Sequence, residues 1–221
     1  MTKGIFITAT GTDVGKTYIS ALIVKKMRQL GYNCGYFKPA MSGIEKGKLC
    51  DVEYVFKTAG LSGNPMDFVS YPFEEALSPH LAAKRSGKEI KIDKIISDFK
   101  RVCSIYDYVL VEGAGGIVCP FNISDKHTLL LPDVIKSLGL DIIVIADAKL
   151  GTINSTVLTV EYARCCGISV SGIILNNYDE NDFMQVDNKF QIGKLTGEKI
   201  ITTVKNNDKD ICSLETFFKE I

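Results

Sequence analysis

Short, almost continuously apolar runs alternate along the chain with longer stretches in which apolar residues recur every three or four positions. The short runs have the length of buried strands, and the longer stretches have the period of amphipathic helices. We expect strands at residues 4–10, 33–38, 108–112, 141–146, 170–176 and 199–204. We expect helices at residues 17–30, 51–58, 93–103, 128–138, 153–166 and 214–220.

This alternation predicts the fold class. Strands that are apolar throughout must be covered on both faces, as they are in a parallel sheet with helices on both sides. Because no linker, repeat or low-complexity segment interrupts the pattern, we expect residues 1–221 to form one α/β domain with a doubly wound, mainly parallel sheet. In such a fold ligands bind beyond the carboxyl ends of the strands, so residues just after each strand are candidates for chemistry.

Charge and hydropathy exclude several classes of partner. The 221 residues carry 26 basic and 26 acidic side chains, so the formal net charge is zero. A neutral chain has no electrostatic reason to bind nucleic acid or an anionic membrane surface. No apolar run approaches the ~20 residues that span a bilayer, and the first expected strand begins too early to leave room for a signal peptide. We expect no nucleic-acid or membrane partner.

The cysteines indicate a reducing compartment. There are seven, an odd number, and they show neither a Cys-x-x-Cys motif nor the Cys/His spacing of a zinc site. We interpret them as reduced core residues of a cytoplasmic protein. A redox pair at Cys165 and Cys166 is disfavoured because neighbouring residues on a helix point in different directions.

The most informative motif is Gly-Thr-Asp-Val-Gly-Lys-Thr at residues 11–17, between an expected strand and an expected helix. Such a loop turns backbone N–H groups toward phosphate oxygens, while Lys16 adds a positive charge and Thr17 can hold Mg²⁺. The usual pattern has a glycine six positions before the lysine, where this chain has Thr10. The match is therefore to Gly-Lys-Thr in its strand–turn–helix context, and it indicates a nucleoside triphosphate site.

Further polar clusters follow the other expected strands. They comprise Lys38 with Ser42, Glu112 with the glycine-rich residues 113–116, residues 147–154 and residues 176–179. A carboxylate at the end of a strand, such as Glu112, suits a nucleotide-bound Mg²⁺, which prefers oxygen ligands. Each cluster alone is weak evidence, but the fold brings all of them to the edge of the sheet that carries the phosphate loop.

Taken together, these motifs resemble the dethiobiotin synthetase family, whose fold is P-loop NTPase-like. The resemblance covers residues 3–178 and is carried by residues 11–17, 37–39, 42–43, 78–80, 111–116 and 149–154. It implies an enzyme that uses ATP and Mg²⁺ to join CO₂ to 7,8-diaminopelargonate, closing a cyclic urea and releasing ADP and phosphate. The implied route passes through a carbamate and a carbamic–phosphoric anhydride.

The resemblance also implies residue roles. The implied catalytic residues are Lys16 and Lys38, and the implied metal ligands are Thr17, Asp51 and Glu112. Implied ATP contacts are Asp13, Val14, Gly15, Lys16, Thr17, Tyr18, Asp51, Glu112, Gly113, Ala114, Gly115, Asn176 and Asn177. Implied substrate contacts are Thr12, Ser42, Gly151, Thr152, Ile153 and Asn154. In the family the last four reach across the twofold interface of a homodimer to hold the substrate's carboxylate.

The implied chemistry needs cations more than a general base. A carbamate is an anion that attacks an anionic phosphoryl group, so Lys38 would pair with the carbamate while Lys16 neutralises the β- and γ-phosphates. A base is not needed, because the carbamate is already a nucleophile. We therefore interpret His80 as a structural or substrate-loop residue and His127 as the start of a helix.

The base-binding end leaves alternatives open. Asn176 falls at the family's adenine-contacting asparagine, yet residues 176–179 also fit the Asn-x-x-Asp frame that reads guanine in GTPases. Residues 182–189 are polar and lack periodicity, which predicts a flexible connection. A partitioning or metal-delivery ATPase of the same superfamily and a small regulatory GTPase are the alternative functions. Partitioning and metal-delivery ATPases often have a second lysine early in the loop, and this chain has none there. Small GTPases have an Asp-x-x-Gly motif that senses the γ-phosphate, whereas here Glu112 is followed by Gly-Ala-Gly-Gly, which argues against that function.

Overall fold

Seven strands form one parallel sheet in the computed structural model, which describes residues 3–45, 47–124 and 128–212. The strand order is β3-β2-β4-β1-β7-β8-β9. The bounds of these strands are β1 Lys3–Ala9, β2 Cys34–Met41, β3 Val69–Pro72, β4 Tyr108–Glu112, β7 Ile142–Asp147, β8 Val170–Asn176 and β9 Ile200–Val204. A separate antiparallel pair consists of β5 Pro120–Ile123 and β6 Thr128–Leu130.

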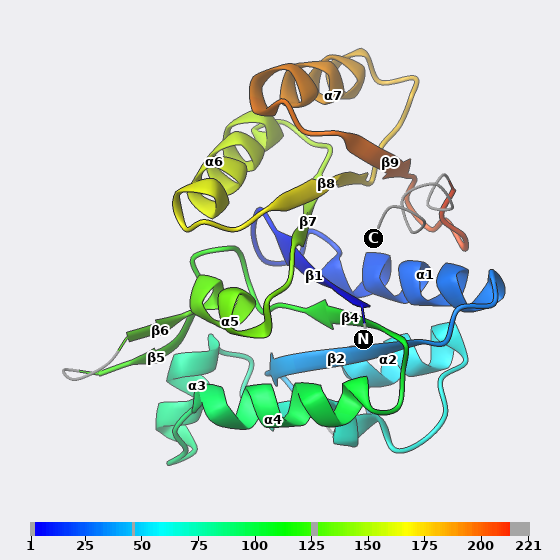
Figure 1. Cartoon of the computed structure of the whole chain (residues 1–221). Helices are drawn as coiled ribbons and strands as arrows, with labels where there is room; N and C mark the ends of the chain where they lie inside the picture. The colour runs from blue at the N-terminus through cyan, green and yellow to red at the C-terminus, as the bar shows by residue number, and fades with distance from the viewer. Residues whose placement is uncertain (1–2, 46, 125–127, 213–221) are drawn as a thin grey trace.

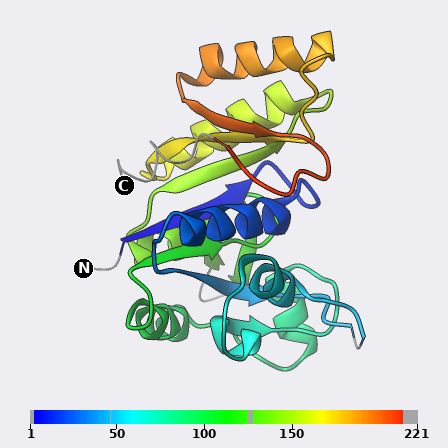
Figure 2. The same ribbon diagram turned by 90° about the vertical axis from the view of Figure 1, so that its right-hand side faces the viewer.

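Helices connect the parallel strands and cover both faces of the sheet (Figures 1 and 2). Helix α1 packs against α2 on one side, and α6 packs against α7 near β8 and β9. The bounds are α1 Lys16–Gln29, α2 Asp51–Ala59, α3 Pro79–Arg85, α4 Ile92–Cys103, α5 Leu131–Leu138, α6 Thr152–Cys165 and α7 Phe183–Thr196, with a 3₁₀ turn η1 at Pro65–Phe68. No helix among the described residues is long and apolar enough to cross a membrane.

Burial explains why the strands read as apolar throughout. All eight residues of β2 are buried, as are the last five of β1 and of β8, because helices pack on both faces. β1 lies between β4 and β7, and the loops after β1, β2 and β4 therefore leave the sheet at one edge. The predicted doubly wound α/β fold is confirmed.

Most predicted elements are present with small shifts. The strands at 108–112 and 170–176 agree with β4 and β8, and the strand at 33–38 extends to Met41. Helix α5 ends where predicted, at Gly139, which has a φ of 66° that favours glycine. The predicted helix at 214–220 and the interpretation of His127 lie outside the described residues.

Three predictions were wrong. Residues 128–130 form β6 instead of the first turn of a helix, because they pair with β5. Residues 183–189 belong to α7, whose N-cap Asp182 accepts hydrogen bonds from the backbone N–H groups of Met184 and Gln185. Cys165 and Cys212 are exposed rather than part of the core, unlike the buried Cys34 and Cys119.

Candidate active site

The phosphate loop joins β1 to α1, as the sequence predicts. Two of its residues adopt the left-handed conformation, Asp13 with a φ of 59° and Gly15 with a φ of 94°. Gly15 is required for a second reason: a Cβ there would lie 2.2 Å from Nδ2 of Asn176, which no real contact allows. Helix α1 begins directly after Gly15, so its first free N–H groups face the loop.

Lys16 lies folded over its own loop. Its side chain is largely buried, and Nζ donates a hydrogen bond to the carbonyl oxygen of Gly11 at 2.9 Å. Burial lowers the pKa of Lys16, and the nearby carboxylate of Glu112 opposes this effect. In the described part of the chain, the neutral Gly11 carbonyl is the acceptor that holds the ammonium, which leaves the group available to an incoming phosphate.

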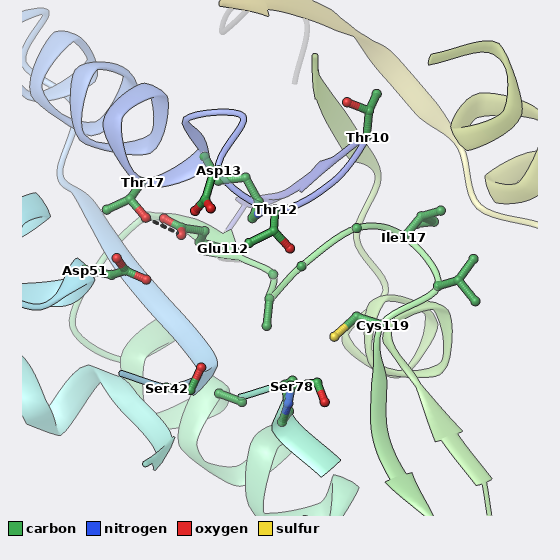
Figure 3. Close-up of a pocket in the computed structure, with 18 of the residues that line it drawn as sticks. Thr10, Thr12, Asp13, Thr17, Ser42, Asp51, Ser78, Glu112, Ile117 and Cys119 are labelled. Atoms are coloured by element: carbon green, nitrogen blue, oxygen red, sulfur yellow. Dashed lines mark hydrogen bonds between the residues drawn. The ribbon is translucent and has the colours of Figure 1, made fainter. Parts of the chain in front are cut away.

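Glu112 is the centre of the site. It ends β4, is fully buried, and uses both carboxylate oxygens. Oε1 accepts hydrogen bonds from Thr17 Oγ1 at 2.8 Å and Lys38 Nζ at 2.6 Å, and Oε2 accepts one from the Tyr36 hydroxyl at 2.8 Å. Figure 3 shows the contact between Thr17 and Glu112, with Asp51 on the neighbouring element.

Lys38 bridges the two carboxylates of the site. Besides Glu112, its ammonium contacts Oδ2 of Asp51, the first residue of α2. Burial alone would lower the pKa of Lys38, but the charges of Glu112 and Asp51 outweigh it and raise the pKa, so the side chain stays protonated. Lys38 is therefore matched by two carboxylates, while Asp13 and Glu161 add further acidic side chains to the lining of the cleft.

Tyr36 is a site residue that sequence reasoning missed. It belongs to β2, and none of it is exposed. Burial, and then the nearby carboxylates, raise the pKa of its hydroxyl well above the ordinary value, so Tyr36 remains a proton donor. The sequence offered only a general indication of its role, because any buried tyrosine hydroxyl needs a hydrogen-bond partner.

A cleft of about 1670 Å³ opens beside these side chains. Every predicted site residue lines it except Val14, Gly151, Thr152, Ile153, Asn176 and Asn177. The structure adds Tyr54, Ser78, Cys119 and Tyr162, which the prediction omitted. Cys119 lies near Lys16, yet burial raises the pKa of its thiol to about 11, so the group is a poor nucleophile.

Asn176 lies behind the phosphate loop. It ends β8 with only 3% of its surface exposed, and its Nδ2 donates to the carbonyl oxygen of Val14 at 3.0 Å. Its Oδ1 is buried and has no hydrogen-bond partner among the described residues. A buried amide oxygen without a partner is costly, so this atom is suited to accept a hydrogen bond from a ligand. The following residue, Asn177, adopts a left-handed φ of 56°.

The segment after β9 lies beside the first turns of α1. The Tyr18 hydroxyl donates to the carbonyl oxygen of Asp208, and Lys25 Nζ donates to that of Lys209 at 2.8 Å. Residues 205–210 therefore adjoin the phosphate-loop helix.

The predicted substrate segment begins α6. Gly151 is the N-cap with a φ of 89°, and Thr152 is buried with its hydroxyl 3.4 Å from that of Thr156. Asn154 is the one member of the segment that lines the cleft, followed by Ser155 on the same helix. In this chain the residues of α6 border the chain's own cleft.

The oxygen donors fit a nucleotide-bound Mg²⁺. Thr17, Asp51 and Glu112 supply a hydroxyl and two carboxylates on one side of the cleft. Among the described residues no three His, Cys, Asp or Glu side chains form a metal cluster, so the protein alone does not build a complete coordination sphere. Mg²⁺ in phosphate-transfer sites is held by one or two carboxylates together with substrate phosphates and water. The present donor set matches that requirement.

The fold, the loop and this donor set define a P-loop nucleotide-binding protein. Comparison with known proteins identifies the family within this class. A family profile described as an AAA domain matches residues 3–210. The ATP-dependent dethiobiotin synthetase BioD of Clostridium botulinum strain 657 is 50% identical over 212 residues, covering 94% of this chain and 93% of that protein. The chain belongs to the family of ATP-dependent dethiobiotin synthetases.

A second relative agrees with this assignment, and solved structures share the fold. The ATP-dependent dethiobiotin synthetase BioD of Clostridium botulinum strain Loch Maree is 45% identical, and both chains are covered completely. Among solved structures, a ParA family ATPase from Chlorobium tepidum TLS has a TM-score of 0.57 at 14% identity, over 94% of this chain and 86% of that one. MinD from Aquifex aeolicus has a TM-score of 0.55 at 14% identity, over 99% and 86%. The last two similarities show the fold alone.

Proposed function

We propose that this chain is a dethiobiotin synthetase, a ligase that uses ATP to join CO₂ to 7,8-diaminopelargonate and close a cyclic urea. One structural observation supports the proposal independently of the similarity to relatives. A second lysine, Lys38, lies buried beside the phosphate loop and stays charged between Glu112 and Asp51. A reaction between two anions needs a cation at that place.

The reaction begins when one amine of the substrate combines with CO₂ to give a carbamate and a proton. A carbamate oxygen attacks the γ-phosphorus of ATP, the bond to the β-phosphate oxygen breaks, and ADP leaves. The second amine then attacks the carbamoyl carbon, phosphate leaves, and the amine loses its proton. The protein forms no covalent bond in this sequence, so it accelerates the reaction by positioning and charge compensation.

Lys16 and Lys38 divide the charge compensation. Lys16 exchanges the Gly11 carbonyl for the β- and γ-phosphate oxygens. Lys38, which contacts Oε1 of Glu112, pairs with the carbamate and with the phosphoryl group as it is transferred. Ser42 and the backbone of residues 113–116 line the same cleft and contact the diamine end of the substrate.

Mg²⁺ is the proposed cofactor. When bound, it neutralises phosphate charge and fixes the triphosphate for in-line attack. Thr17 and Glu112 would hold it from the loop and from β4, and Asp51 would do so from α2. Because the cleft lining has two lysines and four carboxylates, the protein alone does not compensate a triphosphate, and a bound divalent cation would do so.

We further propose that the nucleotide is ATP. The partnerless Oδ1 of Asn176 lies behind the phosphate loop and outside the cleft lining, and it would accept a hydrogen bond from the exocyclic amine of adenine once a bound nucleotide reaches it. At the same position guanine presents a carbonyl oxygen, which would repel Oδ1. Asp13, Val14 and Gly15 contact the phosphates through the loop, Tyr18 lies beside the ribose and base, and Asn177 shapes the turn behind Asn176.

The remaining proposals concern the assembly. The whole chain acts as a single catalytic domain in the cytoplasm and forms a homodimer, in which residues 151–154 of one protomer hold the substrate's carboxylate in the other's site. Leu158 on α6 is 61% exposed, and in this arrangement a second copy would cover it.

Phosphate release measured with and without diaminopelargonate and bicarbonate tests the proposed function. A synthetase hydrolyses ATP slowly until both are present and then releases phosphate rapidly. A switch ATPase of the same fold would hydrolyse ATP at a rate that neither compound changes, and this result would refute the proposal.

A further inference from the structure

Tyr36 and Lys38 reach Glu112 from the same strand. They are two residues apart on β2, so their side chains share one face of the sheet. In the register between β2 and β4, Tyr36 pairs with Leu110, which places Glu112 two residues further along the same face. The arrangement is a consequence of the parallel pairing and not of a flexible loop.

The two oxygens of Glu112 have different neighbours. Oε1 accepts from Thr17 and Lys38, the two side chains that belong to the loop and the cleft. Oε2 accepts from the Tyr36 hydroxyl, whose ring is completely enclosed. The carboxylate is thereby fixed in rotation, with one oxygen toward the ligands and one toward the protein interior.

We infer that Tyr36 restricts Glu112 to a single metal-binding oxygen and thereby favours Mg²⁺ over Ca²⁺ in the nucleotide complex. The inference rests on the proposed function only in requiring a nucleotide-bound metal at Glu112. Mg²⁺ demands a compact octahedron and takes one oxygen from each carboxylate, whereas Ca²⁺ accepts six to eight ligands and commonly takes both oxygens of one carboxylate.

Loss of the Tyr36 hydroxyl should change the affinity of the site for Mg²⁺ and for Ca²⁺ in opposite directions. Oε2 would become a buried acceptor without a donor, and the carboxylate would be free to rotate toward the metal. Ca²⁺ gains a second oxygen by that rotation, while Mg²⁺ loses a ligand that was already oriented. Tyr36 is therefore a positioning residue for the metal and does not itself touch the reacting atoms.

Equilibrium binding of ADP in saturating Mg²⁺ or Ca²⁺ tests the inference without relying on activity. We expect Tyr36→Phe to lower the ratio of ADP affinity in Mg²⁺ to that in Ca²⁺ by about tenfold or more. Losses of metal affinity of about this size are typical when a residue that hydrogen-bonds a metal ligand is removed. The matched control is Tyr71→Phe, which removes a hydroxyl that accepts from Lys91 N at 2.9 Å and has no hydrogen bond to a carboxylate among the described residues. The control should leave the ratio unchanged.

An unchanged ratio in folded Tyr36→Phe, or an equal change in the control, would overturn the inference. Thermal unfolding establishes whether each variant is folded. If Tyr36→Phe does not fold, Tyr36→Met, whose flexible side chain adapts to the cavity, carries the same expectation. ADP binding to the unmutated protein that ignores Mg²⁺ would instead refute the metal site of the proposed function, so the two failures are distinguishable.

Discussion

Lys38 Nζ lies 2.6 Å from Oε1 of Glu112, with 4% of one side chain and none of the other exposed. Removing one member of such a buried pair leaves an uncompensated charge, which typically costs about 3–5 kcal/mol of folding free energy. The same cation faces the cleft where the carbamate would meet the phosphoryl group. Lys38 is thus expected to stabilise both the folded site and the transition state.

Replacing Lys38 by Met removes the charge and keeps most of the apolar stem. We predict that diamine-dependent phosphate release falls by about a hundredfold or more, as when one transition-state contact is lost, while ATP still binds through Lys16 and the loop amides. Stopped-flow phosphate release and separate ATP-binding measurements check this. The control is Lys149→Met, a lysine after β7 whose side chain is 73% exposed. Normal turnover by Lys38→Met would exclude the proposed role.

Asn176→Ala tests the base site. Loss of Oδ1 should weaken ATP binding by about 1–3 kcal/mol, the cost of an adenine amine left without its acceptor. GTP binding should change little, because guanine places an oxygen there. Calorimetric titration of both nucleotides measures the difference. Equal use of ATP and GTP by the unmutated protein would mean that Asn176 confers no discrimination.

The cysteines should differ sharply in reactivity. Burial raises the pKa of the Cys34 thiol to about 12, so only about a thousandth of it is thiolate at pH 9. We predict that exposed Cys165 and Cys212 react first with a thiol reagent, and that raising the pH from 7 to 9 does not make Cys34 reactive until the protein unfolds. Mass spectrometry of labelled peptides identifies the order. Early labelling of Cys34 in folded protein would contradict the packing of β2.

A mixed-dimer experiment tests whether Asn154 acts across an interface. Lys38→Met removes the catalytic cation, and Asn154→Asp places a negative charge against the substrate's carboxylate. If Asn154 serves the partner's cleft, a heterodimer of the two variants contains one intact site, and mixing them restores activity at limiting diamine. If Asn154 serves its own cleft, which it lines in this structure, mixing restores nothing.

The sequence was sufficient for the features that have local or periodic signals. Strands buried on both faces are apolar throughout, so β4 and β8 could be placed to the residue. Gly-Lys-Thr after a strand located the phosphate loop, and Glu112 was recognisable as an acid that ends an apolar strand. These signals depend on the residues themselves and their near neighbours.

The rest depends on contacts between distant residues. Tyr36 looks like any other member of a buried strand, and its partner Glu112 is 76 positions away. The strand at Thr128–Leu130 has three residues and exists because β5 pairs with it. The sequence of α7 shows no apolar stripe, because large apolar side chains such as Phe183 and Phe190 lie on its exposed side. The N-cap residue Asp182 was a usable signal for the start of this helix.

The fate of the carbon of bicarbonate tests the central claim most directly. With ATP, Mg²⁺, diaminopelargonate and ¹³C-bicarbonate, the label should appear in the carbonyl of the cyclic urea, with one labelled product formed for each phosphate released. Carbon NMR and a phosphate assay on the same samples give the ratio. Phosphate released without labelled urea, or at a rate indifferent to diamine and bicarbonate, would contradict the account.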